Sequence, residues 1–170
     1  MQRFSQEWRD WLDRNGSRLM LFARQQTRSE ADAEDVLQVA LVRTWKVHQG
    51  APDSQVVSLA YTNIRRCAID LGRSTERRKR REEEAMLERG ELVAWFELPD
   101  DDTNRALQVA LSKLPEKFRE VITLKIWGEL TFDQIGKTLE ISPNTAASRY
   151  RYGMDALRKS LEGERVGIGL

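Results

Sequence analysis

The chain has 170 residues, of which 40% are hydrophobic and 32% charged, and its formal net charge is +1. This length suits one ordinary domain or two small ones, with small apolar cores beneath a highly charged surface. The single cysteine, Cys67, excludes an internal disulfide framework and fits a reducing compartment. No segment approaches the ~20 apolar residues of a membrane span or resembles a signal peptide, so we expect a cytoplasmic protein.

The first half of the chain carries apolar residues at helical spacing and no convincing strand pattern. One stripe begins at residues 19–23. A second, over 33–45, follows the i, i+3, i+4, i+7 rule closely, and Ser29 is its predicted N-cap. Turn-forming residues at 50–54 separate it from a third stripe over 59–71. These patterns predict three helices.

Charge is distributed in two opposed blocks. Residues 62–81 contain eight basic and two acidic side chains, whereas residues 82–104 contain one basic and nine acidic ones. Such a break in composition is typical of a linker between domains. Because helical stripes resume after it, we predict an all-α protein of two small helical domains joined by an acidic linker.

The strongest local signal lies in residues 131–161. Residues 131–134 carry a capping-box pattern, and Ser142 followed by Pro143 predicts a second helix start. Gly136 stands where the two helices would cross. These features predict a helix-turn-helix, whose second helix enters the major groove of DNA.

The second helix of this motif separates into two faces. Its apolar and small residues share the face that we expect to pack inward: Ala146, Tyr150, Gly153 and Leu157. Its polar residues point elsewhere and are the candidates for contacts to bases and phosphates: Asn144, Thr145, Ser148, Arg149, Arg151 and Tyr152. An ordinary helical hairpin is the alternative, but two caps, the glycine and the arginine-bearing face favour DNA binding.

Known catalytic and metal-binding patterns are missing from the sequence. His48 and Cys67 are the only histidine and cysteine, which is too few for a zinc-finger ligand set. We expect His48 near a helix end at the surface and Cys67 in the core. There is no phosphate-binding glycine loop and no nucleophile with a base partner. We therefore expect no catalytic site, no metal and no cofactor.

Three segments, in this order, resemble blocks of the RNA polymerase sigma factors. Residues 31–46 are similar to the segment that docks on the polymerase clamp, and residues 59–73 to the helix that reads the minus-10 promoter element. Residues 114–124 together with 130–161 resemble sigma domain four, which reads the minus-35 element. The lack of a large middle domain is typical of the extracytoplasmic-function (ECF) group.

The resemblance implies both an organisation and a function. It implies sigma domain two over residues 1–81, an acidic linker over 82–104, sigma domain four over 105–163 and a tail over 164–170. The function implied is that of a non-enzymatic initiation factor, which binds core RNA polymerase, directs it to specific promoter DNA and helps to melt the minus-10 region. Family members commonly have an anti-sigma partner, although nothing in this chain identifies one.

Individual residues carry over from the family. Polymerase contacts are implied for Asp32, Asp35 and Gln38, which the apolar face of their helix leaves outward, whereas we expect Trp45 in the core. DNA contacts are implied for Arg65, Arg66 and Arg73, which lead into five more basic residues and form a phosphate track.

Two connecting segments also have counterparts in the family. Residues 49–55 match the loop that holds a base flipped out of the duplex. The acidic linker matches a segment that threads the polymerase cleft and RNA exit path, and a plain disordered spacer is an equal alternative. The aromatic residues Trp8, Trp11, Phe22 and Trp127 are expected to be core or partner-contact residues, while Trp95 and Phe96 within the linker lack a simple explanation.

This chain departs from the family pattern at a few positions. Ala147 and Tyr152 stand where basic residues are usual, which points to a different promoter preference. Glu140 replaces the usual turn glycine; because glutamate disfavours a left-handed backbone, we expect a differently built turn. Gly72 replaces a leucine, and we expect the minus-10 helix to end or bend there.

Two rival functions remain open at this point. A free-standing regulator would use only the helix-turn-helix, and stable binding to core polymerase would exclude it. A helical adaptor without a DNA role would show promoter binding that is absent or insensitive to salt.

Overall fold

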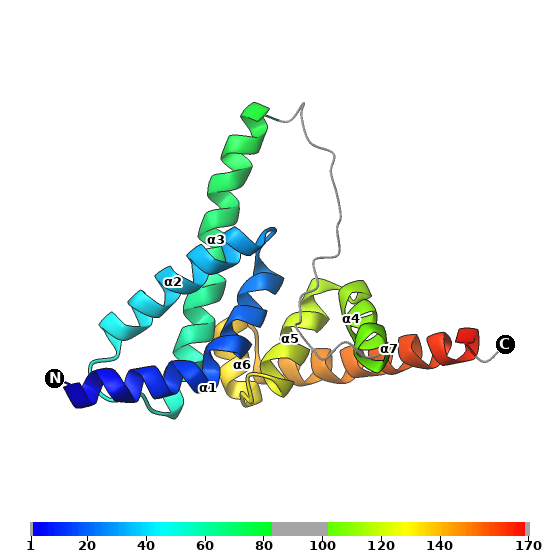
Figure 1. Cartoon of the computed structure of the whole chain (residues 1–170). Coiled ribbons are helices and arrows are strands. Elements are labelled where there is room, and N and C mark those ends of the chain that lie inside the picture. The colour runs from blue at the N-terminus through cyan, green and yellow to red at the C-terminus, as the bar shows by residue number, and fades with distance from the viewer. Residues whose placement is uncertain (1, 83–101, 169–170) are drawn as a thin grey trace. The chain divides into compact units, whose positions relative to one another are not determined.

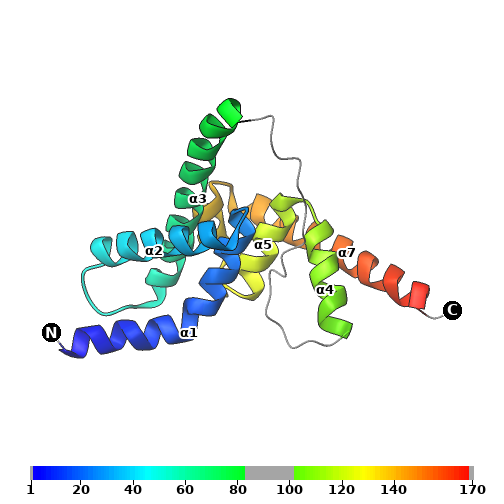
Figure 2. The ribbon, with the colours of Figure 1, turned by 45° about the horizontal axis from the view of Figure 1, so that its top comes forward.

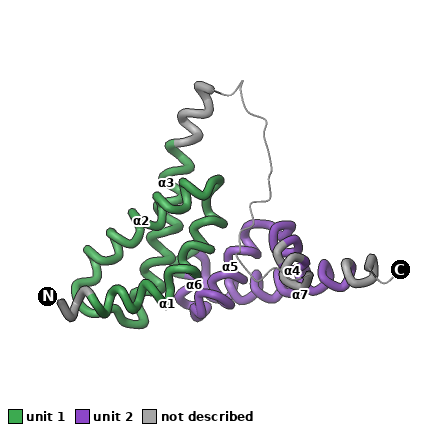
Figure 3. The backbone as a smooth tube through the Cα atoms, in the orientation of Figure 1, with its two compact units in different colours: residues 1–90, 137–139 green, residues 91–136, 140–170 purple. Residues whose placement is uncertain are grey.

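The computed structural model describes residues 2–82 and 102–168, and all regular structure in these ranges is helical (Figures 1 and 2). The helices are α1 (Gln2–Gln26), α2 (Glu30–Val47), α3 (Ser54–Glu82), α4 (Asp102–Lys113), α5 (Glu116–Ile126), α6 (Phe132–Leu139) and α7 (Pro143–Ile168). The chain divides into two compact units, residues 1–90 with 137–139 and residues 91–136 with 140–170 (Figure 3). The predicted all-α, two-domain fold is confirmed.

Some predicted features lie outside the described residues. They are most of the acidic linker with Trp95 and Phe96, the side chains of the basic run 77–81, and the tail side chains from residue 164 onward.

The first unit is a three-helix core in which each of α1, α2 and α3 packs against the other two. Phe22 and Tyr61 are fully buried and meet edge to face, with ring centroids 5.3 Å apart. Trp8 and Trp11 are also buried, so of the two predicted alternatives, core and partner contact, they take the core position. Each large side chain removed from water in this way stabilises the fold by about 1.5–3 kcal/mol.

A buried polar contact joins α2 to α3. Asn63 Nδ2 donates a hydrogen bond to Thr44 Oγ1 (2.9 Å), and that hydroxyl donates to the carbonyl of Ala40 (2.7 Å). Because a buried polar group without a partner costs about 1–3 kcal/mol, this contact favours one register between the two helices.

Helix ends in this unit follow local chemistry, with one correction. The hydroxyl of Ser29 accepts the N–H of Asp32 (3.1 Å), which confirms the predicted cap of α2. The predicted end of the helix at Gly72 is wrong, since α3 runs through this residue to Glu82, and the alternative of a bend there stays a prediction. Gly72 is exposed and a side chain there would meet nothing within 4 Å. Glycine therefore weakens the helix without breaking it.

The second unit is built on α7, against which α4 and α5 pack. α5 and α7 approach closely at Gly153, where a Cβ atom would lie 2.9 Å from Ile122 Cδ1 and 3.1 Å from Phe118 Cβ. Ala146 and Leu157 are buried on the same face of α7, and Tyr150 is half-buried. The inward face predicted for this helix is confirmed.

Candidate nucleic-acid and protein interfaces

The start of α6 and the start of α7 carry the predicted caps. Thr131 Oγ1 accepts the N–H of Gln134 (3.2 Å), and Gln134 Oε1 accepts the N–H of Thr131 (2.9 Å), which completes a capping box. Ser142 Oγ accepts the N–H of Thr145 (3.1 Å) at the start of α7. These bonds satisfy N–H groups that helix ends leave unpaired.

The turn between α6 and α7 depends on Gly136 and Glu140. A Cβ atom at Gly136 would lie 2.7 Å from the carbonyl oxygen of Ile141, so only glycine fits without moving the backbone. Glu140 adopts φ 58° and ψ 44°, and its N–H donates to the carbonyl of Gly136. The prediction of a differently built turn is wrong, because the usual left-handed turn forms with glutamate in it.

The outward face of α7 carries the predicted DNA-reading residues. Asn144, Arg151 and Tyr152 are exposed, the last to 57%, while Thr145, Ser148 and Arg149 are half-buried. Three of them, Asn144, Ser148 and Arg151, fall in one row by helical spacing. The guanidinium of Arg151 lies 5.1 Å from the ring centroid of Tyr152, a cation–π arrangement that orients both side chains.

Aromatic contacts join α6 to α7 behind this face. The rings of Phe132 and Tyr150 meet edge to face at 5.8 Å, and Lys125 Nζ lies 4.3 Å from the Phe132 ring centroid. A recognition helix must be held firmly if its side chains are to meet base edges with fixed geometry.

The basic face of α3 is partly open to solvent. Arg66 and Arg73, seven residues apart and therefore on one side of the helix, are exposed, and Arg65 is half-buried. Cys67 is buried as predicted. Burial raises the pKa of its thiol, and this effect outweighs the lowering by Arg43; Asp70 raises the pKa further. The thiol is therefore neutral at neutral pH.

On α2 the structure corrects one prediction and adds two residues. Trp45, expected in the core, is 52% exposed, and Val39 and Val42 are similarly exposed. Helical spacing places them on one face with Asp35 and Gln38, which are also exposed. We call these five residues the α2 face. The sequence signal was an apolar stripe on α2 wider than one buried face requires.

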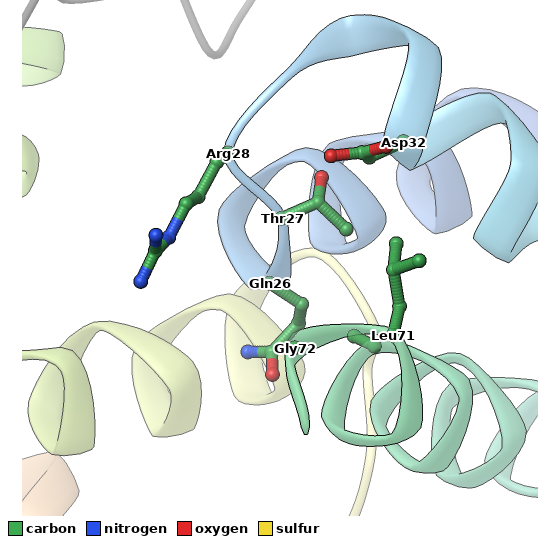
Figure 4. A pocket seen from close by; sticks show the side chains of 7 residues that line it. Gln26, Thr27, Arg28, Asp32, Leu71 and Gly72 are labelled. Atoms are coloured by element: carbon green, nitrogen blue, oxygen red, sulfur yellow. The ribbon is translucent and has the colours of Figure 1, made fainter. Parts of the chain in front are cut away.

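Asp32 has a different environment from Asp35. It is half-buried and lines a pocket of about 80 Å³ together with Gln26, Thr27, Arg28, Ala68, Leu71 and Gly72. Figure 4 shows Asp32 and Thr27 on one side of this pocket and Leu71 and Gly72 on the other. The volume is far below the ~300–1,000 Å³ of small-molecule sites, so we assign no ligand to it.

The described residues contain neither a metal-binding cluster nor a membrane-spanning helix. Within them, no three His, Cys, Asp or Glu side chains gather closely enough to hold a metal ion. No helix among them has the length and apolar character needed to cross a membrane.

Two known family models match separate segments of the chain. Residues 11–79 match sigma-70 region 2, and residues 110–159 match sigma-70, region 4. The chain is 30% identical over 132 residues to the RNA polymerase sigma-E factor of Streptomyces antibioticus, an overlap of 77% of this chain and 71% of the relative. The chain belongs to the sigma-70 family.

Other relatives place this sigma factor in the ECF group. It is 29% identical over 157 residues to the RNA polymerase sigma-E factor of Streptomyces avermitilis, covering 92% of this chain and 86% of that one. It is 38% identical over 76 residues to the ECF RNA polymerase sigma factor SigW of Bacillus subtilis, covering 42% and 41%.

A solved structure has the same fold. The sigma factor RpoE in complex with the anti-sigma factor NepR, from Bartonella quintana, aligns with a TM-score of 0.70 at 18% identity, covering 91% of this chain and 96% of that one. The two family matches and the sigma-factor relatives show that this ECF sigma factor is a transcription initiation factor that binds core RNA polymerase and directs it to promoters, in a family of non-enzymatic transcription factors.

Proposed function

We propose that this sigma factor divides its work among three helices: α2 docks on core polymerase, α3 reads the minus-10 element and α7 reads the minus-35 element. The observation that carries the proposal is the α2 face, which exposes a tryptophan and two valines beside Asp35 and Gln38. A contiguous exposed apolar patch of this kind marks a protein interaction site. We assign domain two to residues 1–81, the linker to 82–104 and domain four to 105–163.

The α2 face combines the two elements of a protein interface. Trp45, Val39 and Val42 supply apolar area, and tryptophan is enriched among residues that dominate binding energy. Asp35 and Gln38 supply polar contacts that fix orientation. Asp32 stays in the proposal as a contact at the edge, since its carboxylate is half-buried beside the pocket.

On α3, Arg66 and Arg73 are suited to contact phosphates, with Arg65 beside them, because a guanidinium binds phosphate oxygens with two parallel hydrogen bonds. The adjoining loop, residues 49–55, is proposed to hold a base extruded from the minus-10 element. Extrusion costs a few kcal/mol, which contacts on the protein must offset.

On α7, the first three turns carry the proposed base contacts. Asn144 suits the donor and acceptor pair of adenine, and Arg151 suits guanine. Thr145, Ser148, Arg149 and Tyr152 complete the set as contacts to the backbone and the thymine methyl group.

The proposal extends to the setting in which the protein works. The polymerase performs the chemistry, so we assign no catalytic residue to this chain, and we place its action in the cytoplasm. RpoE of Bartonella quintana was crystallised with an anti-sigma factor. An anti-sigma protein that covers these surfaces is therefore a partner we propose here too.

Run-off transcription with bacterial core polymerase tests the proposal. The wild-type protein should produce specific transcripts from promoter fragments of its own genome, whereas core alone should not. Trp45→Ala should weaken binding to core about 10-fold or more, at unchanged thermal stability. Val47→Ser is the matched control, because Val47 is 70% exposed on the same helix but lies off the α2 face.

The rival function predicts a different result. A free-standing regulator would bind promoter DNA alone, give no transcripts with core and show no difference between the two variants.

A further inference from the structure

Within the first unit, two side chains hold the loop between α2 and α3 in place. Trp8 Nε1 donates a hydrogen bond to the carbonyl of Gly50 (3.1 Å). His48 Nε2 lies 2.9 Å from the carbonyl oxygen of Ala51. Because a carbonyl oxygen can only accept, Nε2 of His48 carries the proton in this contact. Two consecutive loop carbonyls are thus bound by side chains, one from α1 and one from His48, the C-cap residue of α2.

Both donors are themselves fixed by an aromatic cluster. The ring of Trp8 meets that of His48 at a centroid distance of 6.2 Å and that of Trp11 at 5.6 Å, both edge to face. Trp8 is 8% exposed and Trp11 is 3% exposed, so both indoles belong to the core, whereas His48 is half-buried at its edge. Figures 1 and 2 both show the α2–α3 connection beside the N-terminal part of α1, the helix that supplies these tryptophans.

The far end of the loop is also fixed. Asp53 Oδ1 accepts the N–H groups of Gln55 (2.9 Å) and Val56 (3.3 Å), which caps the start of α3. Gly50 adopts φ +146°, a backbone conformation that other residues rarely take. The loop therefore has a defined shape although Gln49, Ala51 and Asp53 are exposed.

A loop that is ordered before binding does not lose its backbone entropy during binding. Ordering one residue costs a free energy comparable to that of a typical binding contact. A pre-formed loop does not incur this cost on binding, so more of the contact energy remains as net binding free energy. The two bonds fix the carbonyls of Gly50 and Ala51, and the exposed residues Gln49, Ala51 and Asp53 remain open to a ligand.

We propose that Trp8 and His48 are positioning residues for promoter melting: they hold residues 49–55 in the shape that receives the extruded base. This inference rests on the proposed role of the loop. It adds two residues that are not among those proposed above to contact DNA, and neither is proposed to touch DNA itself.

The test uses holoenzyme made with the full chain and a forked promoter DNA, double-stranded upstream and single-stranded through the minus-10 element. Affinity is measured with the intact strand and with an abasic residue at each unpaired position in turn. For the wild type, the captured base should raise affinity by about 10-fold at one position. We call the affinity for the intact fork divided by the affinity for the abasic fork the capture ratio. This ratio isolates base capture, because polymerase docking and phosphate contacts are present in both DNAs.

Trp8→Phe and His48→Phe keep an aromatic ring but remove the donor. In both, the ratio should fall toward one, while affinity for core and for the abasic fork is unchanged. Trp11→Phe is the matched control: it makes the same change in the same cluster, and Trp11 Nε1 has no hydrogen-bond partner among the described residues. Its ratio should stay at the wild-type value.

Other outcomes overturn the inference. A wild-type ratio in both Trp8→Phe and His48→Phe would show that the loop needs neither bond. An equal loss in Trp11→Phe would show that core packing, not the hydrogen bonds, positions the loop. If the wild-type protein itself gave a ratio of one at every position, the proposed role of the loop would be wrong as well. Run-off transcripts from the wild-type protein would then show that the initiation function still stands.

Discussion

At the scale of single residues, Glu140 is a point of backbone strain; among the described residues it shares a positive φ with one other non-glycine residue, Glu129. A left-handed conformation costs a residue with a Cβ about 1–2 kcal/mol, and glycine avoids most of this cost. The side chain of Glu140 is exposed, so removing it costs little packing energy. We expect Glu140→Gly to raise the free energy of unfolding by about 0.5–1 kcal/mol, seen as a few degrees in calorimetry. Glu140→Ala, which keeps the Cβ, should give no gain.

Cys67 leads to a second prediction at this scale. Burial raises the pKa of its thiol above the ordinary value of 9.0, so the reactive thiolate is scarce in the folded protein. A thiol reagent at pH 7 should label the folded chain slowly and the urea-unfolded chain fast.

The same shift sets a pH dependence for stability. The folded state resists ionisation of Cys67, so the thiol leaves stability unchanged below its ordinary pKa and reduces it as the pH rises through that value. Cys67→Ala should remove this part of the alkaline decline in denaturant titrations. Labelling of the folded chain as fast as the unfolded one would contradict the buried assignment.

At the scale of elements, two glycines predict opposite effects of one substitution. Gly136→Ala would place a Cβ 2.7 Å from the Ile141 carbonyl, so the α6–α7 turn must open, at a net loss of about 1–2 kcal/mol after the gain in helix propensity. Gly72→Ala in α3 meets nothing within 4 Å and should add about 0.5–1 kcal/mol. Calorimetry of both variants measures the contrast, and a loss for Gly72→Ala would indicate a contact that the described residues do not provide.

The same elements show what sequence can predict. The caps at Ser29, Thr131 and Ser142 follow from bonds that span three residues, so they were predicted correctly. The exposure of Trp45 was not, because a face that a partner will cover has the same apolar periodicity as a face that the core covers. The left-handed backbone of Glu140 was not predicted for another reason. The hydrogen bonds to the carbonyl of Gly136 outweigh the preference of glutamate against this conformation.

The loop at residues 49–55 marks a further limit of sequence. Its place was predicted from the family, but its anchors were not. Trp8 lies 42 residues from Gly50, and a bond across that separation leaves no local pattern. Its role as a core residue was predictable from its type, whereas the use of its indole N–H required the fold.

At the scale of the whole molecule, the near-neutral net charge hides the two surfaces proposed to meet DNA. Arg66 on α3 and Arg151 on α7 belong to different compact units. If Arg66 binds a phosphate, Arg66→Ala should weaken holoenzyme binding equally on all promoters and reduce the slope of log affinity against log salt by about one. If Arg151 reads a base, Arg151→Ala should weaken binding only where the minus-35 sequence is intact.

The double variant tests whether the two units act independently. Distant sites without shared partners contribute additively to binding free energy. Promoter affinity of Arg66→Ala plus Arg151→Ala should therefore fall by the product of the two single losses. On a promoter with a mutated minus-35 element, the double variant should match Arg66→Ala alone. A smaller combined loss on the intact promoter would mean that losing one contact already releases the other, so that minus-10 and minus-35 recognition are coupled through the polymerase or the DNA.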